Sequence, residues 1–440
     1  MSEHQQSERP MNGKAEPVSE LTEGLARHIL QRLGESGQPP DQGISVLNVG
    51  NETYLKVLDA EYLSRLANEP LASSFKLVQG YYGGGKTHFL YCVRERAWHR
   101  GFLTALVNLS PRECPYDDPV KVYAAVATNL SSPPLSEGAE PTQGLPDILR
   151  DLAEDRREQL SDKAVRQWIG RTASRVSAES HSYRRAASMF LSACLDEDWD
   201  RQALLEAWLR GEPVPLKETR PLGIYEAIEP ATGFKMLRSL TQVISGYGLP
   251  GVVLLFDEVD RNLSLGSRKM HAVGDNLRQV IDLCGQARLP STLFLYAVPP
   301  EFLRNVVPEY PALDQRLKSP VSLSERSPQA AVIDLEKLDL GPVELLEAIG
   351  ARIEQIFCRA TGWAADGDLQ ARSRATLAKT MSAYTFEISH RRLFVKTYVD
   401  FLYGQQADGE QVLSGDAAEA LVQGSYLGLE VETDDEFFDA

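Results

Sequence analysis

A glycine-rich loop between a strand pattern and a helix pattern is the feature that most constrains this chain. Residues 75–79 form a short apolar run typical of a strand, the octapeptide Gly80–Thr87 follows, and a helical pattern covers residues 86–100. The octapeptide matches G-x-x-x-x-G-K-[ST] at every fixed position. Its glycines let the backbone curl so that N–H groups point inward, and the helix N-terminus adds partial positive charge. This context predicts a site for the phosphates of a nucleotide.

The side chains of the loop predict how a nucleotide would be held. Lys86 is expected to reach the β- and γ-phosphates, and the Thr87 hydroxyl is expected to take one coordination position on Mg²⁺. For His88, packing in the first helical turn is the alternative to a nucleotide contact. The predicted nucleotide-binding residues of this segment are Gly80, Gly83, Gly84, Gly85, Lys86, Thr87 and His88. The predicted cofactors are ATP and Mg²⁺, although no base-reading motif separates ATP from GTP.

A second motif places two acids directly after an apolar strand pattern. Residues 252–256 are all apolar, and Asp257 and Glu258 follow them. Asp257 is expected to hold Mg²⁺, mostly through its water shell, and Glu258 to orient or deprotonate an attacking water. The alternative is a strand that ends in a solvated acidic turn, since Asp260 follows as well. Beside the glycine-rich loop, the acid pair predicts hydrolysis rather than binding alone.

The spacing of the motifs indicates a fold class. Between Lys86 and Asp257 only one clear strand pattern occurs, at residues 102–109, and another follows at residues 292–298. In a sheet with one strand between the two motif strands, the 292–298 strand becomes the next neighbour, which is the arrangement of AAA-like ATPases. The predicted fold is therefore α/β, an AAA-like P-loop NTPase with a parallel sheet, a helical insertion at about 111–248 and a C-terminal helical lid.

The remaining patterns predict how the chain is organised. In order, we expect a disordered leader (1–19), an N-terminal helical and strand segment (20–70), the ATPase core with its insertion (71–335), the helical lid (336–425) and an acidic tail (426–440). Within the N-terminal segment, the patterns favour helices at 21–33 and 52–66 and a short strand at 44–49. A fifth core strand is placed at 320–323.

Composition narrows the environment and the partners. The formal net charge of −16 disfavours coating of the whole surface by nucleic acid. The sequence has no apolar run of about 18 residues and no secretory signal pattern, so we expect a cytoplasmic protein without membrane contact. Its five cysteines lie far apart and fit neither a disulfide framework nor a zinc site.

One basic island stands out from the acidic background. Residues 156–185 contain eight basic and three acidic side chains. Such an island is able to contact DNA phosphates or an acidic partner. A solvated helix face, or an intramolecular match with acids elsewhere in the chain, is the more frequent explanation of such a pattern.

Several segments together resemble a known family. They are the loop with its surroundings (residues 74–78, 83–91 and 109–115) and residues 49–55, 208–212, 256–258 and 313–317. Over roughly residues 20–405 the chain resembles the P-loop ATP-binding proteins of BREX phage-defence systems, of the BrxD kind. The resemblance implies an AAA-like ATPase in a multiprotein system that modifies host DNA and blocks phage. The implied partners are other defence proteins, among them a methyltransferase and a helicase.

Comparison with AAA proteins also suggests two arginines that act from a distance. Arg316 lies where these proteins commonly present a finger arginine to a neighbouring subunit, which would require a homo-oligomer. A surface or salt-bridged arginine is the alternative. In the C-terminal region Arg392, rather than Arg391, is the candidate for a lid-borne sensor of the nucleotide.

Two strand ends raise questions about turnover. The position at which this family and AAA ATPases favour a small polar sensor is occupied by Pro299, so that Tyr296 or a backbone group must substitute, or turnover is slow. Asn108 is either a polar switch that contacts Glu258 or a strand-end asparagine with satisfied hydrogen bonds, the latter being more frequent. Three functions follow: an ATPase that drives conformational change in a DNA-associated defence complex, a nucleotide-gated scaffold with little turnover, or a signalling ATPase.

Overall fold

The computed structural model describes residues 18–69, 72–110, 112–135, 139–257, 267–286, 288–317, 321–384 and 390–438. These residues separate into two compact units. Val57–Glu336 forms one unit, here called the sheet unit, and Met1–Lys56 with Lys337–Ala440 forms the other, here called the helical unit. The N-terminal segment that the sequence placed at 20–70 is therefore divided between the two units.

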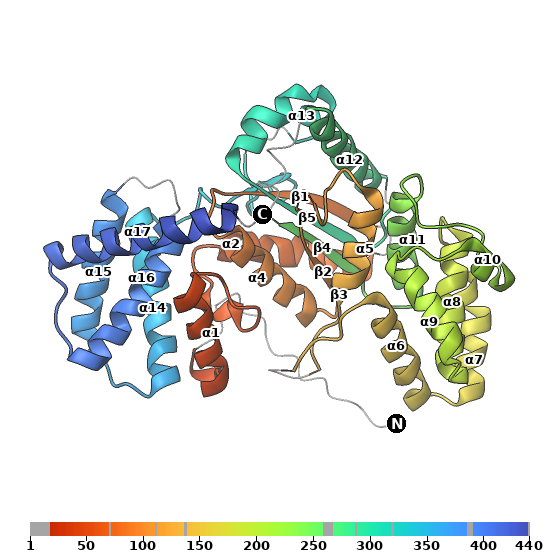
Figure 1. Cartoon of the computed structure of the whole chain (residues 1–440), viewed down its shortest axis with the longest axis horizontal. Coiled ribbons are helices and arrows are strands. Elements are labelled where there is room, and N and C mark those ends of the chain that lie inside the picture. Colours follow the sequence, from red (N-terminus) through yellow and green to blue (C-terminus); the bar gives the residue numbers. More distant parts are fainter. Residues whose placement is uncertain are drawn as a thin grey trace. The chain divides into compact units, whose positions relative to one another are not determined.

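Six strands form a single sheet in the sheet unit (Figure 1). They are β1 (Ser73–Gln79), β2 (Leu103–Asn108), β3 (Leu130–Ser131), β4 (Val252–Asp257), β5 (Thr292–Val298) and β6 (Val332–Asp334). Their order is β3-β2-β4-β5-β1-β6, and all neighbours pair in parallel except β2 and β3. The prediction that β5 lies between the two motif strands is confirmed. Every residue of β4 and β5 is buried, as their unbroken apolar runs require.

Two of the predicted strands are wrong. Of the predicted strand 320–323, residue 320 lies outside the described residues, and Leu323 donates one backbone hydrogen bond to Val332 without forming a strand. The sixth strand is β6 instead, which pairs with residues 77–79 of β1. Residues 44–47 form the 3-10 turn η2 (Ile44–Leu47), whose apolar side chains are buried against helices rather than in a sheet.

The two faces of the sheet are covered differently. Helix α4 (Lys86–His99) contacts β2, β4 and β5, and its Phe89, Leu90 and Val93 are buried. The opposite face contributes Leu254 and Phe256 of β4 to the main core cluster, which also contains residues of α5, α8, α11 and α12 but none of α4. We call the first the α4 face and the second the core face. Because side chains alternate along a strand, Asp257 belongs to the α4 face.

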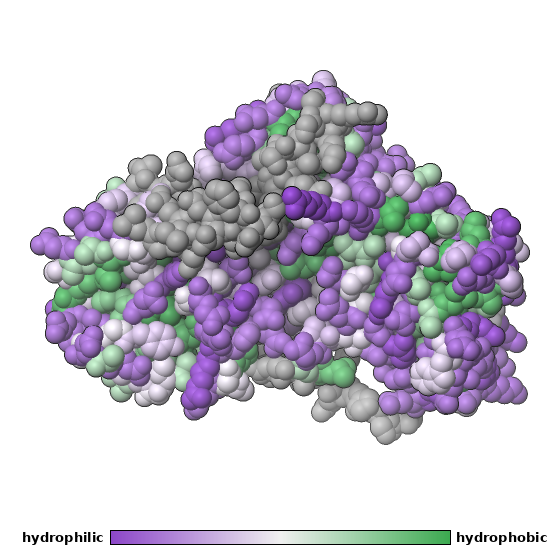
Figure 2. All heavy atoms as spheres, viewed as in Figure 1, coloured by the Kyte–Doolittle hydropathy of each residue, from purple (hydrophilic) through white to green (hydrophobic). Residues whose placement is uncertain are grey.

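Residues between β2 and β4 form the helical insertion that the sequence predicts, interrupted by β3. Its helices are α5 (Pro119–Asn129), α6 (Leu145–Gln159), α7 (Asp162–Arg171), α8 (His181–Asp196), α9 (Trp199–Arg210), α10 (Leu216–Thr219) and α11 (Gly233–Gly246). After β4 the sheet unit adds α12 (Ser267–Gly285) and α13 (Pro311–Leu317). Figure 2 shows mostly hydrophilic residues on the face drawn there, in keeping with the charged composition.

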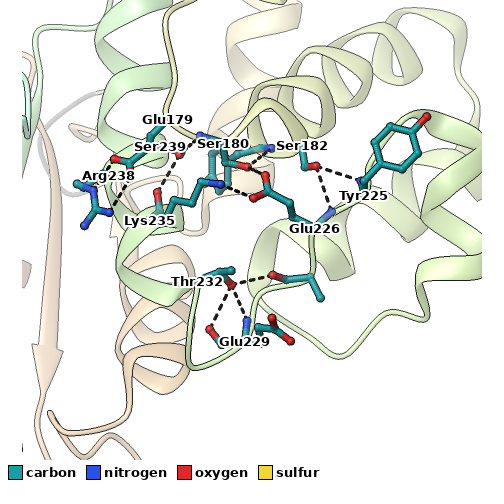
Figure 3. A network of polar contacts seen from close by, with 12 residues as sticks. Glu179, Ser180, Ser182, Tyr225, Glu226, Glu229, Thr232, Lys235, Arg238 and Ser239 are labelled. Atoms are coloured by element: carbon teal, nitrogen blue, oxygen red, sulfur yellow. Dashed lines mark hydrogen bonds and ion pairs between the residues drawn. The ribbon is translucent and has the colours of Figure 1, made fainter.

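A polar network fixes the insertion around Glu226 (Figure 3). The Glu226 carboxylate accepts a hydrogen bond from Ser180 Oγ at 2.6 Å and pairs with Lys235 of α11. Nearby, Arg238 of α11 forms two hydrogen bonds to Glu179, at 2.6 and 2.8 Å, which lower the pKa of that carboxyl group. Ser180 is fully buried and caps α8, so the network joins the start of α8 to α11.

The helical unit combines both ends of the described chain. It contains α1 (Glu23–Ser36), most of α2 (Glu52–Leu58), α14 (Pro342–Thr361), α15 (Gly367–Ala383), α16 (His390–Asp408) and α17 (Gly415–Phe438). Helix α1 packs on α14 and α16, and Arg27 donates to the Ala360 carbonyl at 3.0 Å. The packing of α1 on α14 and α16 joins segments that lie more than 300 residues apart in the sequence. The sequence pattern does not reveal it, so the N-terminal segment was predicted as a separate part. The sheet unit begins with the end of α2, the π-helical turn η3 (Asp59–Leu63) and α3 (Ser64–Asn68).

The predicted leader and the predicted acidic tail lie at the two ends of the chain. Most of the predicted leader, residues 1–17, lies outside the described residues, and Val18–Glu20 forms the 3-10 turn η1. Helix α17 continues through the predicted acidic tail as far as Phe438. In the part of the chain that the structure describes, no helix has both the length and the apolar character needed to cross a membrane.

Candidate functional site

The glycine-rich loop leaves β1 at the carboxyl edge of the sheet and enters α4. The Gly80 N–H donates to the Val298 carbonyl of β5 at 3.1 Å, and the Gly84 N–H donates to the Tyr81 carbonyl at 2.9 Å. Gly83 and Gly85 have φ of 70° and 86°, a region that residues with side chains rarely adopt. The loop therefore forms a tight turn directly before the N-terminus of α4, where the first N–H groups of a helix point away from its own carbonyl groups.

Gly84 is required by close neighbours as well as by the turn. A Cβ atom at this position would lie 2.8 Å from Glu336 Oε1 and 2.9 Å from the Tyr81 carbonyl oxygen. Both distances are too short for any side chain to be accepted without a shift. The same Glu336 oxygen accepts the Tyr81 N–H at 3.1 Å. Glu336 follows β6 and is absent from the site that the sequence predicts.

The Lys86 side chain folds back onto its own loop. Its ammonium group donates to the carbonyl oxygens of Gly80 and Tyr81, both at 3.0 Å, and the residue is buried. A buried ammonium group beside a glycine-rich loop and the N-terminus of a helix is a donor that suits a phosphate anion. To contact a phosphate, the ammonium group exchanges these carbonyl oxygens for phosphate oxygens.

The structure brings the two sequence motifs together. Thr87 Oγ1 at the start of α4 donates to Asp257 Oδ2 at the end of β4, at 2.5 Å. Asp257 is only 2% exposed. No group of three or more His, Cys, Asp or Glu side chains suited to a metal is found among the described residues. A hydroxyl with one carboxylate nevertheless fits Mg²⁺, which keeps several waters and takes further oxygen ligands from a substrate's phosphates.

Two further polar residues lie near this pair. Asn108 ends β2 in register with Asp257, so its side chain belongs to the α4 face. It is exposed and forms no side-chain hydrogen bond with another described residue, and both its role as a polar switch that contacts Glu258 and the alternative of a strand-end asparagine stay predictions. His88 Nε2 lies 3.5 Å from Cys92 Sγ, one turn along α4, and its contact with a nucleotide stays a prediction. Glu258, the predicted base, lies outside the described residues.

The two predicted arginines have partners inside their own units. Arg316 forms a bidentate ion pair with Asp282 of α12, at 2.6 and 3.0 Å, and donates to the Ala312 carbonyl at 2.6 Å. This is the salt-bridged alternative that the sequence left open. Arg392 Nε, on α16 of the helical unit, donates to the Ser36 carbonyl at 3.1 Å. For both residues, a role at the nucleotide stays a prediction.

The end of β5 excludes Tyr296 as the replacement for the polar sensor, whereas a backbone group in that role stays a prediction. Tyr296 is fully buried on the core face, with its ring 5.1 Å from that of Tyr116 and 6.1 Å from that of Phe256. Its hydroxyl has no hydrogen-bond partner in the part of the chain that the structure describes. Because Tyr296 and Asp257 face opposite sides of the sheet, the suggestion that Tyr296 substitutes for Pro299 is wrong. Alternation places Pro299 itself on the α4 face.

Most of the basic island is matched within the chain. Arg166 pairs with Asp196 at 2.6 Å, and Arg156 stacks on Trp168 with 3.9 Å between its guanidinium and the ring centre. Arg157, Arg184 and Arg185 also have acidic, imidazole or carbonyl partners. Lys163, Arg171 and Arg175 are exposed and form no ion pair with any described residue. The free positive charge is thus smaller than the sequence count suggests.

Sequence reasoning found the loop and the acid but missed Glu336. The signal that finds it is the position of β6, because an acid directly after a strand beside β1 lies next to the loop. The sequence pattern of β6 is short, and residues 320–323 were predicted as a strand in its place. Without β6, the sequence does not place Glu336 beside the loop.

Comparison with known proteins gives one match. The model of a family described as "BREX system ATP-binding protein BrxC/D" matches residues 22–411. No curated protein and no solved structure matches the chain.

Proposed function

Since the chain belongs to the BrxC/D family of BREX system ATP-binding proteins, we propose that it binds Mg-ATP and hydrolyses it to drive conformational change in a phage-defence complex acting on DNA. The observation that carries the proposal is the 2.5 Å hydrogen bond between Thr87 and Asp257. Two motifs far apart in the sequence, each able to serve one half of a nucleotide–magnesium site, meet at one edge of the sheet. Membership of the family identifies the ligand as ATP and the system as a BREX phage-defence system.

Each part of the proposed site has a separate task. The N–H groups from Gly83 to Thr87 are proposed to surround the phosphates, and Lys86 to contact the β- and γ-phosphates once it leaves the loop carbonyls. Thr87 and Asp257 would hold Mg²⁺ directly or through water. When bound, that ion would neutralise charge on the phosphate oxygens. Glu258 is proposed as the residue that orients or deprotonates the attacking water.

The strand order supports an AAA-like P-loop core. The loop follows β1, the acid ends β4, and β5 lies between these strands. Ligands of open parallel sheets bind outside the carboxyl ends of the strands, where Gly80 and Asp257 lie. This is the arrangement that the motif spacing predicted for AAA-like ATPases.

Binding and turnover of ATP by three variants test the proposal. Lys86→Ala should abolish ATP binding, and Glu258→Gln should bind ATP but fail to hydrolyse it. Lys163→Ala removes an exposed lysine that forms no ion pair with any described residue, so it is the matched control and should behave like the wild type when no DNA is present. Wild-type turnover by Glu258→Gln would refute Glu258 as the base, and wild-type ATP binding by Lys86→Ala would refute the nucleotide site itself.

A nucleotide-gated scaffold with little turnover is the second candidate function. The observation that favours it is the end of β5, where Pro299 occupies the sensor position and Tyr296 faces the other side of the sheet. With no side-chain donor from β5, the γ-phosphate would be stabilised less in the transition state. Single-turnover measurements of ATP hydrolysis distinguish the two candidates. A scaffold would keep its bound ATP unhydrolysed for much longer than its protein partners take to bind and dissociate.

Beyond the nucleotide, the proposed contacts of the protein are with DNA and with other proteins. Lys163, Arg171 and Arg175 are candidates for binding DNA phosphates, and their contribution should weaken as salt rises. Methyltransferase and helicase components of the same system are the proposed protein partners. If the protein forms a homo-oligomer with Arg316 as a finger residue, that arginine must first leave Asp282, so Arg316→Ala should lower ATPase activity only in the assembled form.

A further inference from the structure

One peptide group of the loop is held from both sides. The Gly80 carbonyl oxygen accepts a hydrogen bond from the Lys86 ammonium group at 3.0 Å. On the other side of the same peptide group, the Tyr81 N–H donates to the Glu336 carboxylate at 3.1 Å. The Lys86 ammonium group, which is proposed to contact the phosphates, and the Glu336 carboxylate thus bind the same peptide group.

The fold places Glu336 at this position through β6. The ladder between β1 and β6 ends with Gln79 opposite Asp334, and the Leu335 N–H donates to the Gln79 carbonyl at 2.9 Å. The buried Asp334 carboxylate then accepts the Glu336 N–H at 3.1 Å, which turns the chain. Charge-assisted hydrogen bonds of this kind are stronger than neutral ones. The backbone of β6 and the turn after it therefore place the exposed Glu336 side chain beside the loop.

The chain enters the helical unit directly after Glu336. Glu336 is the last residue of the sheet unit, and Lys337 is the first residue of the second stretch of the helical unit. The Lys337 carbonyl accepts a hydrogen bond from Tyr54 of α2 at 2.9 Å, and Asp339 accepts one from Thr53 at 3.0 Å. Within one peptide bond, the chain passes from a contact with the loop to contacts inside the helical unit.

From these contacts we infer that Glu336 is a positioning residue that couples nucleotide occupancy of the loop to the helical unit. This inference rests on the proposed function. When Lys86 turns to the phosphates, the Gly80–Tyr81 peptide group keeps only its bond to Glu336, and negative charge enters the loop beside that carboxylate. The movement of Lys86 and the added negative charge both change the surroundings of the Glu336 carboxylate. Since Lys337 is the next residue, a shift of Glu336 is passed on to the helical unit. By thermodynamic linkage, ordering of the helical unit changes the affinity for ATP to the same extent.

Hydrogen–deuterium exchange of the full-length protein, with and without Mg-ATP, tests the inference. The variants are Glu336→Ala, which removes the acceptor, and Glu336→Gln, which keeps an oxygen for the Tyr81 N–H. Glu325→Ala is the matched control, because Glu325 is an exposed acid that precedes β6 and makes no contact with the loop. Glu336 is itself exposed, so none of these substitutions disturbs the core.

In the wild type and in Glu325→Ala, Mg-ATP should slow exchange both in residues 80–87 and in residues 337–345. Glu336→Ala should keep the response of the loop and lose that of residues 337–345, and Glu336→Gln should restore it. The inference is overturned if residues 337–345 respond alike in the wild type and Glu336→Ala, or if Glu336→Ala no longer binds ATP, since Glu336 would then belong to the binding site. No response of the wild-type loop itself would instead refute the proposed function.

Discussion

The two faces of the sheet are built from the same strands and both bury apolar side chains, but they differ in their buried polar and aromatic side chains. On the α4 face, Lys76, Lys86 and Asp257 are buried together with polar partners. On the core face, Phe256 and Tyr296 lie in an aromatic cluster in which two tyrosine hydroxyls have no hydrogen-bond partner among the described residues. Under the proposed function, one face provides the chemistry and the other the stability. Phe256 and Asp257 are consecutive residues on opposite faces, so they allow a direct test.

Phe256→Ala should have the largest effect, and the effect should be on stability. The ring stacks on Phe294 with 5.3 Å between ring centres and lies 5.6 Å from that of Tyr116, so its removal opens a cavity. Such truncations lower the free energy of unfolding by about 3–5 kcal/mol. Urea unfolding measures this loss, while the dissociation constant for ATP of the folded protein should stay near the wild-type value. A large loss of ATP affinity with unchanged stability would break the division between the faces.

Asp257→Asn should show the reverse pattern. An amide in place of the carboxylate leaves the shape of β4 intact but removes the charged oxygen that is paired with Thr87. If Asp257 holds Mg²⁺, ATP turnover should fall by about 100-fold or more, because a metal contributes several kcal/mol to the transition state. The steady-state rate at saturating Mg²⁺ is the measurement, with Glu325→Gln as control. A rate within a factor of two of the wild type would show that Asp257 is not a metal ligand.

How well the strands and the candidate site could be predicted from the sequence depends on the length of the sequence pattern that marks each of them. The long apolar runs of β4 and β5 were located almost to the residue, because strands buried on both faces leave no polar position. The three residues of β6 carry too little pattern to separate them from residues 320–323. The motif residues Lys86, Thr87 and Asp257 could be proposed from the sequence because the predicted chemistry fixes their residue types. Glu336 and the Arg316–Asp282 pair were not, since such contacts depend on packing between distant segments.

Lys76 allows a test of the α4 face by pH. Its ammonium group donates to Tyr62 at 2.6 Å and to the Ala330 carbonyl at 2.8 Å, and burial lowers its pKa to about 7. Between that value and about 10.4, the usual lysine pKa, the unfolded chain binds more protons than the folded one. The free energy of unfolding should therefore rise with pH, by up to about 1.4 kcal/mol per pH unit.

Urea unfolding at pH 7, 8 and 9 measures this slope for the wild type and for Lys76→Met. Other titrating groups are common to both proteins, so they cancel in the difference. Lys76→Met should lose the rise with pH and should be the more stable protein at pH 7, since methionine needs no desolvation of a charge. Equal slopes for the two proteins would mean that Lys76 is not buried as a titrating group.

Tyr296→Phe should have the smallest effect and tests whether the core face takes part in the chemistry. Its buried hydroxyl has no partner among the residues that the structure describes, so its removal should raise the free energy of unfolding, by about 1 kcal/mol, and leave ATP turnover unchanged. Tyr123→Phe is the matched control, because the Tyr123 hydroxyl donates to the Leu209 carbonyl at 2.6 Å in the same kind of surroundings. That variant should lose stability by about 1 kcal/mol. If Tyr296→Phe slows turnover while Tyr123→Phe does not, the Tyr296 hydroxyl reaches the reaction, and the two faces act together.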